Sequence, residues 1–168
     1  MAAAQAIRSE AIAPAHAAGD FAEAATLLRT YAASLPVDLA YQGFDAEVAA
    51  LPGPYAPPEG ALLVARAHGR AAVGCVAMRP LGDGICEMKR LYVAPAGRGT
   101  GLGRRLAEAV IAAAERAGHR EMWLDTLPSM GAALTLYRAL GFVPVPAYYE
   151  TPVAGTVFLG RTLGTGRA

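Results

Sequence analysis

The stretch RGTGLG, residues 98–103, is the feature that most constrains this chain. It follows a strand-like apolar run and precedes a long amphipathic run, so it joins a predicted strand to a predicted helix. A dinucleotide-binding loop would need a third glycine where Arg104 stands, and a P-loop would need a Lys-Ser or Lys-Thr pair that the sequence lacks. What remains is an Arg-x-x-Gly-x-Gly pattern at Arg98, Gly101 and Gly103.

A glycine-rich loop at the start of a helix is suited to bind an anion. The first N–H groups of a helix have no partner inside the helix, and the helix dipole makes that end positive. Gly101 and Gly103 remove side chains where a pyrophosphate would approach the backbone, and Arg98 adds a guanidinium. The local sequence equally allows a glycine turn that only lets the helix pack closely.

Composition narrows the class of protein. A chain of 168 residues, 54% of them hydrophobic, predicts one ordered globular domain over residues 1–168. Fifteen basic and fourteen acidic residues give a net charge of +1, so neither a nucleic-acid partner nor a membrane partner is expected. Arg8 and Glu10 interrupt any signal-peptide core, and no run of about 18 apolar residues occurs, so we expect a cytoplasmic protein.

The two cysteines do not form a metal-binding pattern. A turn centred near Gly82 would place Cys75 opposite Lys89 and Cys86 opposite Met78, which argues against a disulfide between the two. We expect free, buried thiols and no metal ion.

The hydrophobic pattern predicts an α+β fold. A period of 3.6 residues marks four helical segments, and the third carries an i,i+4 pair between Arg104 and Glu108. We expect Asp20 to cap the first helix and Ser129 to cap the last. The four segments are residues 17–35, 41–51, 101–117 and 130–140.

Six further segments alternate like strands. Short turns make the first three antiparallel neighbours, and the helix before the fourth makes it parallel to the third. The expected result is a mixed, mostly antiparallel sheet flanked by helices. The segments are residues 61–68, 71–79, 86–94, 120–127, 142–150 and 155–163. Strict alternation in the third would place Glu87, Lys89, Leu91 and Val93 on one face and Met88, Arg90 and Tyr92 on the other.

Two separated segments resemble the GNAT superfamily of acyl-CoA-dependent N-acetyltransferases. The family's R/Q-x-x-G-x-G/A loop corresponds to residues 98–103, and its L-Y-x-x-x-G-F helix end corresponds to residues 136–142. The similarity is close over roughly residues 85–145. Two motifs at family-like spacing are more specific than either motif alone.

The resemblance implies a binding site for acetyl-CoA. In the family, two parallel strands splay apart and the pantetheine arm lies in the gap, with the pyrophosphate on the glycine loop. Carried over, the cofactor would contact the backbone of Leu91, Tyr92 and Val93, with an oxyanion held at Leu91 or Tyr92. The loop would contribute Arg98, Gly99, Thr100, Gly101, Leu102, Gly103 and Arg104. For Arg104 the alternative is a solvated position on the exposed face of the helix. For Arg105 we prefer that solvated position.

The implied reaction is attack of a primary amine on a thioester. An amine with a pKa near ~10.4 is almost entirely protonated at neutral pH, so a general base or a water chain is required. Glu87 is the first candidate, with a surface ion pair to Lys89 or Arg90 as the alternative, and Asp125 is the second candidate. The resemblance makes Tyr137 the general acid, although its helical position also suits the core.

One position departs from the family pattern. Many relatives carry an asparagine seven residues before the tyrosine, and this chain has Met130 there, so the contact is lost or taken over by Ser129. That departure suits a rival hypothesis, a non-catalytic acyl-CoA sensor. A second rival is a structural protein that pairs through its last strands, and a homodimer through that edge is also possible.

The acceptor is predicted to be a small molecule or amino acid with a primary amine. Aromatic and acidic residues suited to a cationic amine occur before the first strand and near the C-terminus, where ordinary packing is the alternative explanation. They are Asp38, Tyr41, Phe44, Asp45, Glu47, Tyr148, Tyr149 and Glu150.

Overall fold

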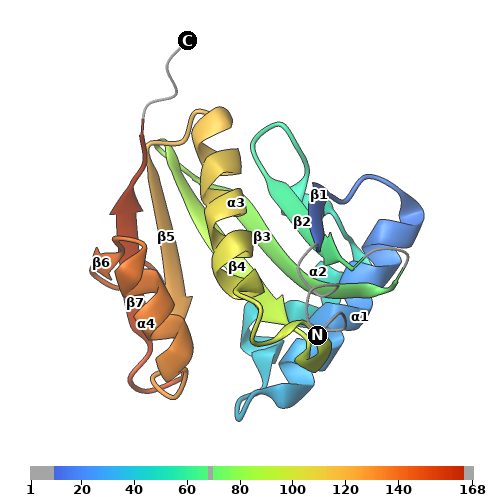
Figure 1. Ribbon diagram of the computed structural model, residues 1–168. Coiled ribbons are helices and arrows are strands. Elements are labelled where there is room, and N and C mark those ends of the chain that lie inside the picture. The colour runs from blue at the N-terminus through green and yellow to red at the C-terminus, as the bar shows by residue number, and fades with distance from the viewer. Residues whose placement is uncertain (1–9, 68–69, 165–168) are drawn as a thin grey trace.

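The computed structural model describes residues 10–67 and 70–164, which form a seven-stranded mixed sheet flanked by helices (Figure 1). The strand order is β1-β2-β3-β4-β5-β7-β6, and β4 and β5 are the parallel pair. This confirms the predicted fold class. The strands are β1 (Ala11–Pro14), β2 (Ala61–Arg66), β3 (Ala72–Gly82), β4 (Ile85–Val93), β5 (Glu121–Thr126), β6 (Val143–Pro144) and β7 (Val157–Thr162).

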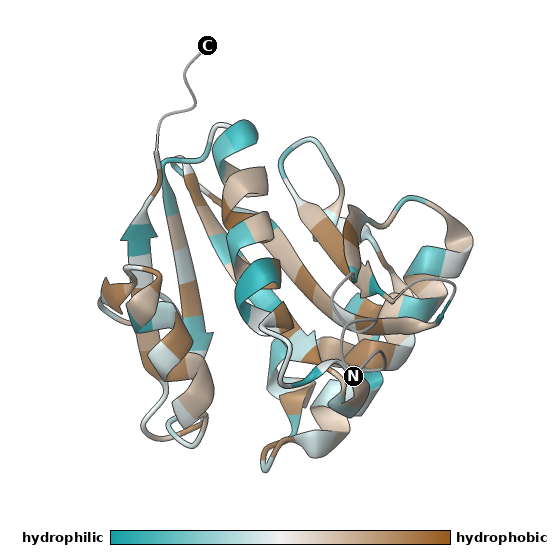
Figure 2. Cartoon of the chain, in the orientation of Figure 1, coloured by the Kyte–Doolittle hydropathy of each residue, from teal (hydrophilic) through white to brown (hydrophobic). Residues whose placement is uncertain are grey.

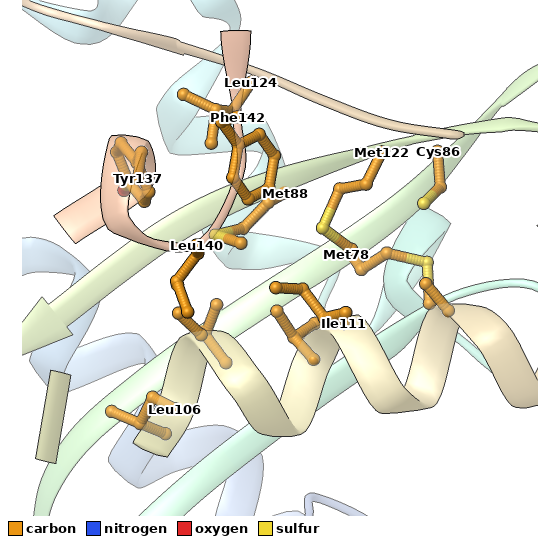
Figure 3. Close-up of a cluster of buried hydrophobic side chains, with 14 of the residues drawn as sticks. Met78, Cys86, Met88, Leu106, Ile111, Met122, Leu124, Tyr137, Leu140 and Phe142 are labelled. Atoms are coloured by element: carbon orange, nitrogen blue, oxygen red, sulfur yellow. The ribbon is translucent and has the colours of Figure 1, made fainter. Parts of the chain in front are cut away.

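Helices cover both faces of the sheet. The α-helices are α1 (Ala18–Ser34), α2 (Phe44–Ala49), α3 (Leu102–Arg116) and α4 (Gly131–Ala139), and short 3-10 helices span Leu39–Gln42, Gly53–Tyr55 and Pro95–Gly97. α3 and α4 pack on one face with alternate residues of β2 and β3, and α1 and α2 pack on the other face. Figure 3 shows the α3 side of this core, and the bands of colour along β5 in Figure 2 follow its alternation.

Two predicted helix caps are wrong. α1 begins after Ala17, and Asp20 lies at the third helical position, where its carboxylate accepts the N–H groups of His16 and Ala17 at 3.0 Å each. α4 begins after Met130, and no side chain caps it, so Ser129 does not serve that role. The predicted helix over 41–51 is interrupted because Gly43 adopts a left-handed conformation between the 3-10 turn and α2.

The strand predictions fail at the two edges of the sheet. β1 was not predicted, because four residues rich in alanine and proline carry no alternation. The segment predicted as a strand over 142–150 pairs with β7 at Val143 and Pro144, donates once more from Val145 N to Phe158 O at 3.0 Å, and then continues as a loop to Thr156. The free thiols are confirmed, but their register is not, since Cys75 lies opposite Tyr92 and Cys86 opposite Pro80.

A β-bulge in β4 overturns the predicted faces of that strand. Cys75 lies opposite Tyr92 while Ala77 lies opposite Lys89, so β4 has one extra residue between them, and Arg90 has a φ of 61°. The extra residue reverses the alternation. Glu87 and Lys89 therefore share the α1 face with Arg90 and Tyr92, while Met88, Leu91 and Val93 face α3.

Candidate active site

The parallel strands β4 and β5 separate at the centre of the sheet. They pair at three positions, from Ile85 opposite Glu121 to Glu87 opposite Trp123. Beyond that point β4 continues to pair with β3 as far as Val93, and β5 continues to pair with β7 as far as Thr126. The predicted splay is therefore confirmed, and Figure 1 shows the two strands diverging below α3.

Two adjoining cavities occupy the splay. The inner cavity, with a volume of about 80 Å³, is lined by Tyr31, Tyr41, Lys89, Arg90, Asp125 and Tyr137 among others. The outer groove, about 510 Å³, extends to Val93, Arg98, Gly103 and Ser129. Leu91, Met130 and Ala133 line both, so one path leads from the glycine loop to the centre of the sheet.

The glycine loop is open toward solvent where an anion would bind. Gly99 and Gly101 have φ values of 77° and 78°, which side-chain-bearing residues rarely adopt, and a Cβ atom at either would meet nothing within 4 Å. The first i→i−4 bond of α3 runs from Arg105 N to Gly101 O at 3.1 Å. The N–H groups of residues 102–104 precede it and have no acceptor within the helix. This loop fits a pyrophosphate.

The arginines near the loop have different partners. Arg98 lines the outer groove and donates from Nε to Val93 O at 3.1 Å. Arg104 forms the predicted pair with Glu108, at 2.8 Å on the exposed side of α3. Arg105 is not the solvated residue expected from the sequence, because its guanidinium binds Glu10, which is buried.

The backbone of β4 presents Leu91 and Val93 to the gap. Ala94 N donates to Val73 O at 2.8 Å, so the backbone groups of Ala94 and Tyr92 face β3, and those of the alternate residues face away from it. The Tyr92 ring lies on the α1 face, 5.5 Å from the ring of Tyr31. The cofactor contacts of these residues remain predictions.

Glu87 is held on both carboxylate oxygens. Oε1 accepts from Arg79 Nε at 2.7 Å, and Oε2 accepts from the Tyr148 hydroxyl at 2.6 Å. Lys89 Nζ lies 3.8 Å from Oε1. With a side chain only 1% exposed, Glu87 is an internal anchor beside the splay rather than a surface ion-pair residue. Its role as a base remains a prediction.

Asp125, the second candidate base, lines the inner cavity from β5. Its Oδ2 accepts from the Tyr149 hydroxyl at 2.6 Å. From the sequence we predicted that Tyr148 and Tyr149 contact the acceptor. In the structure each of them donates a hydrogen bond to a carboxylate on one of the two splayed strands. Nothing in the local sequence indicated that pairing.

Tyr137 lies both at the inner cavity and in the core, and its role as the general acid remains a prediction. It lines the inner cavity, yet its side chain packs edge-on against Phe142 with ring centroids 5.8 Å apart (Figure 3). Burial raises the pKa of this phenol, and the nearby Tyr31 and Asp125 raise it further. The phenol is therefore protonated throughout the neutral range.

The start of α4 carries Met130 where many relatives have asparagine. Thr126 Oγ1 contacts Met130 Sδ at 3.7 Å, and Met130 lines both cavities. Ser129 is exposed in the outer groove. It is therefore available to a ligand, although its replacement of the asparagine contact remains a prediction.

Some residues predicted to bind the acceptor lie elsewhere. Phe44 is buried, with the Arg90 guanidinium 5.1 Å from its ring centre, and Asp38 accepts from Ala40 N at 2.9 Å at the start of a 3-10 helix. Glu47 pairs with Arg90. The inner cavity instead includes residues the sequence did not single out for the acceptor, chiefly Tyr31, Gln42 and Lys89.

Comparison with known proteins identifies the family of this chain. The model of the Acetyltransferase (GNAT) family matches residues 27–142, a segment that contains α3, the glycine loop and the splay. The chain belongs to the GNAT family of acetyltransferases. This GNAT protein is accordingly an acetyl-CoA-dependent N-acetyltransferase.

Individual relatives agree with the family. An uncharacterised N-acetyltransferase of Schizosaccharomyces pombe is 41% identical over 134 residues, which cover 79% of this chain and 82% of that protein. A GNAT-family acetyltransferase of Staphylococcus aureus has the same fold, with a TM-score of 0.77 at 16% identity over 93% of this chain and 100% of its own. A phosphinothricin acetyltransferase of Sinorhizobium meliloti, solved with acetyl-CoA, has a TM-score of 0.68 at 20% identity over 94% and 90%.

The described helices do not include one long and apolar enough to cross a membrane.

Proposed function

We propose that this GNAT protein transfers an acetyl group from acetyl-CoA to the primary amine of a small molecule. The observation that carries the proposal is the path formed by two adjoining cavities, which runs from the glycine loop to the cavity lined by Asp125 and Tyr137. A long, anionic acyl carrier fits the outer part of that path. A small acceptor fits the inner part.

The chain offers three kinds of contact to coenzyme A. The N–H groups at the start of α3 and the open space at Gly99 and Gly101 fit its pyrophosphate. The backbone of Leu91 and Val93 faces the gap and can hydrogen-bond the amides of the pantetheine arm. Arg98 lies at the mouth of the outer groove and adds positive charge.

The acceptor amine must lose a proton before it attacks. Asp125 faces the inner cavity, so it can take that proton directly or through water without any rearrangement. Glu87, the first candidate from the sequence, is 1% exposed, is not among the residues that line the two cavities, and accepts from Arg79 and Tyr148. We therefore assign proton removal to Asp125 and the positioning of the β4 wall to Glu87.

The leaving thiolate needs a proton or a hydrogen-bond donor. Tyr137 holds its proton firmly because burial raises its pKa, so it donates a hydrogen bond to the sulfur at neutral pH. In net terms the ammonium group loses two protons. One ends on the coenzyme A thiol, and the other leaves through Asp125 to solvent.

Calorimetric titration with acetyl-CoA tests the binding step. Gly103 lies in the first turn of α3, where a Cβ atom would come no closer than 3.8 Å to Val93 Cγ2, so a side chain there does not strain the backbone. We expect Gly103→Glu to weaken binding at least about tenfold by placing a carboxylate beside the pyrophosphate, and the neutral Gly103→Gln to weaken it less.

Thiol release then separates an enzyme from a sensor. Tight binding of acetyl-CoA with amine-dependent release of coenzyme A supports the proposed function. Binding without release for any primary amine would favour the sensor. Equal affinities of wild type and Gly103→Glu for acetyl-CoA would show that the glycine loop does not bind the cofactor.

A further inference from the structure

Lys89 is the only lysine in a chain that otherwise uses arginine for its basic side chains. It lies on β4 just before the bulge, its side chain is 8% exposed, and it lines the inner cavity. Lysine is almost never buried to this extent unless its charge is paired. Its ammonium is a compact point charge, unlike the planar fork of arginine.

The protein itself does not saturate the Lys89 ammonium. The nearest carboxylate oxygen is Glu87 Oε1 at 3.8 Å, beyond hydrogen-bond distance, and both oxygens of Glu87 already accept from Arg79 and Tyr148. Within residues 10–67 and 70–164, Nζ makes no hydrogen bond. Burial lowers the pKa of Lys89, whereas Glu87 and Asp125 act in the opposite direction. An anion in the inner cavity would relieve this desolvation.

The other cation on the same wall is neutralised. Arg90 donates from Nε and Nη2 to the two oxygens of Glu47 at 2.8 and 3.2 Å, and from Nη1 to Gln42 Oε1 at 2.8 Å. Its guanidinium also lies over the Phe44 ring. Lys89 is therefore the cation of the β4 wall that remains available to a ligand.

The opposite wall carries an anion. Asp125 lines the inner cavity from β5 and uses Oδ2 to accept from Tyr149. Its other oxygen, Oδ1, has no hydrogen bond to any residue that the structure describes. The inner cavity thus offers an ammonium donor on one wall and a carboxylate acceptor on the other.

We propose that the acceptor is a zwitterion, an amino acid whose carboxylate binds Lys89 and whose ammonium binds Asp125. The inference rests on the proposed function and deepens it by naming the class of acceptor. Lys89 then acts as a specificity-determining residue. Asp125 receives the ammonium and, as proposed above, its proton.

Matched substrates test the inference on the wild-type protein. L-alanine is compared with ethylamine, and L-phenylalanine with phenethylamine, because each pair differs only in the carboxylate. The amino acid has the lower ammonium pKa in each pair, so kcat/KM is calculated on the concentration of the neutral amine. With acetyl-CoA saturating, we expect kcat/KM to be at least about tenfold higher for the amino acid of the preferred pair, the discrimination expected from a hydrogen bond to a charged group.

The variant Lys89→Met keeps a long side chain and removes the charge. We expect it to bring the ratio of kcat/KM within each pair close to one, mainly through a higher KM for the amino acid. Arg138→Met removes an exposed cation from the last turn of α4 and serves as the control, with the wild-type ratio retained. Circular dichroism checks that each variant is folded.

A direct binding measurement does not depend on the variant. Protein labelled with ¹³C at the lysine Cε gives one signal, because the sequence has one lysine. With coenzyme A bound, we expect L-alanine or L-phenylalanine to shift that signal and the matching amine to leave it in place.

Three results would overturn the inference. Amines without a carboxylate could be acetylated as well as the amino acids, which would leave the proposed function standing. Mass spectrometry could find a stable acetyl group on Lys89 itself, which would make the lysine an acceptor. Acetyl-CoA could bind without acetylation of any amine, which would contradict both the proposed function and the inference.

Discussion

The hydroxyl of Tyr148 donates to Oε2 of Glu87 at 2.6 Å, across 61 positions of the sequence. The next residue, Tyr149, donates to Oδ2 of Asp125 at the same distance. Glu87 belongs to β4 and Asp125 to β5, so two consecutive residues of one loop connect the two strands that separate at the active site. The loop therefore fixes how the two walls of the inner cavity face each other.

Removal of the Tyr148 hydroxyl should destabilise the fold. Tyr148→Phe keeps the ring contacts with Trp123 and Phe158, at 5.3 and 5.2 Å between centroids, but leaves one oxygen of the buried Glu87 carboxylate without a donor. We expect the free energy of unfolding to fall by about 2 kcal/mol. Tyr149→Phe is the matched control, and we expect about half that loss because its partner Asp125 is less buried. Urea denaturation measures both, and equal losses would contradict the anchoring role of Glu87.

The pair between Glu47 and Arg90 should be a second point of stability. Both side chains are largely buried, 12% and 5% exposed, and Arg90 occupies the bulge. Glu47→Gln leaves the guanidinium without its counter-charge, so we expect a loss of about 3 kcal/mol in the free energy of unfolding. Thermal melting measures it. The double variant Glu47→Gln/Arg90→Met should recover part of the loss, and a double variant less stable than the single one would contradict this explanation.

The helices, the central strands and the motifs made of neighbouring residues could be predicted from the sequence. The ends of the third predicted strand and of the helix over 101–117 were predicted to within one residue, because periodicity and glycine stops mark those ends locally. The splay followed from the family resemblance rather than from the residues. The conformation of the glycine loop was predictable from its own residues, because the Arg-x-x-Gly-x-Gly pattern is local in the sequence.

The failures involve interactions that local sequence does not encode. The alternation around Arg90 breaks where two charged residues, Lys89 and Arg90, are adjacent, but that break does not by itself identify a bulge, and an arginine with positive φ is rare. The bulge moves Lys89 and Arg90 onto one wall, and that arrangement decides the charge of the inner cavity. The tyrosine–carboxylate pairs join segments distant in the sequence, so only the tertiary structure reveals them.

Alkaline pH should unfold the protein through its tyrosines. Burial is the first cause that raises the pKa of five of the seven phenols: Tyr31, Tyr55, Tyr137, Tyr148 and Tyr149. In the unfolded chain they ionise near pH ~10, so above that pH the unfolded state binds fewer protons than the folded state and stability falls as pH rises. Below that value their contribution is fully present.

Absorbance at 295 nm, which follows phenolate, measures this effect beside circular dichroism. We expect these five phenols to stay protonated at pH 10 and to ionise together with loss of structure at higher pH. Ionisation of all seven tyrosines near pH 10 with the fold intact would contradict the burial of the tyrosine cluster.

Loss of the Tyr137 hydroxyl should affect the chemical step rather than cofactor binding. Tyr137→Phe keeps the packing against Phe142 and removes the donor to the leaving sulfur. We expect kcat to fall by about 10²-fold, as for other positioned proton donors, with little change in the calorimetric affinity for acetyl-CoA. Pre-steady-state measurement of thiol release checks the assignment. A large loss of affinity with kcat retained would instead make Tyr137 a packing residue of the cofactor site.

Proton removal from the acceptor can be assigned by comparing two carboxylates of different accessibility. Asp125 faces the inner cavity, so Asp125→Asn should lower kcat/KM for the amine by about 10²-fold or more. Glu87→Gln should mainly lower stability, because Arg79 and Lys89 would lose the negative charge beside them. If Glu87→Gln instead lowered kcat/KM for the amine as much as Asp125→Asn in a folded protein, Glu87 would be the base.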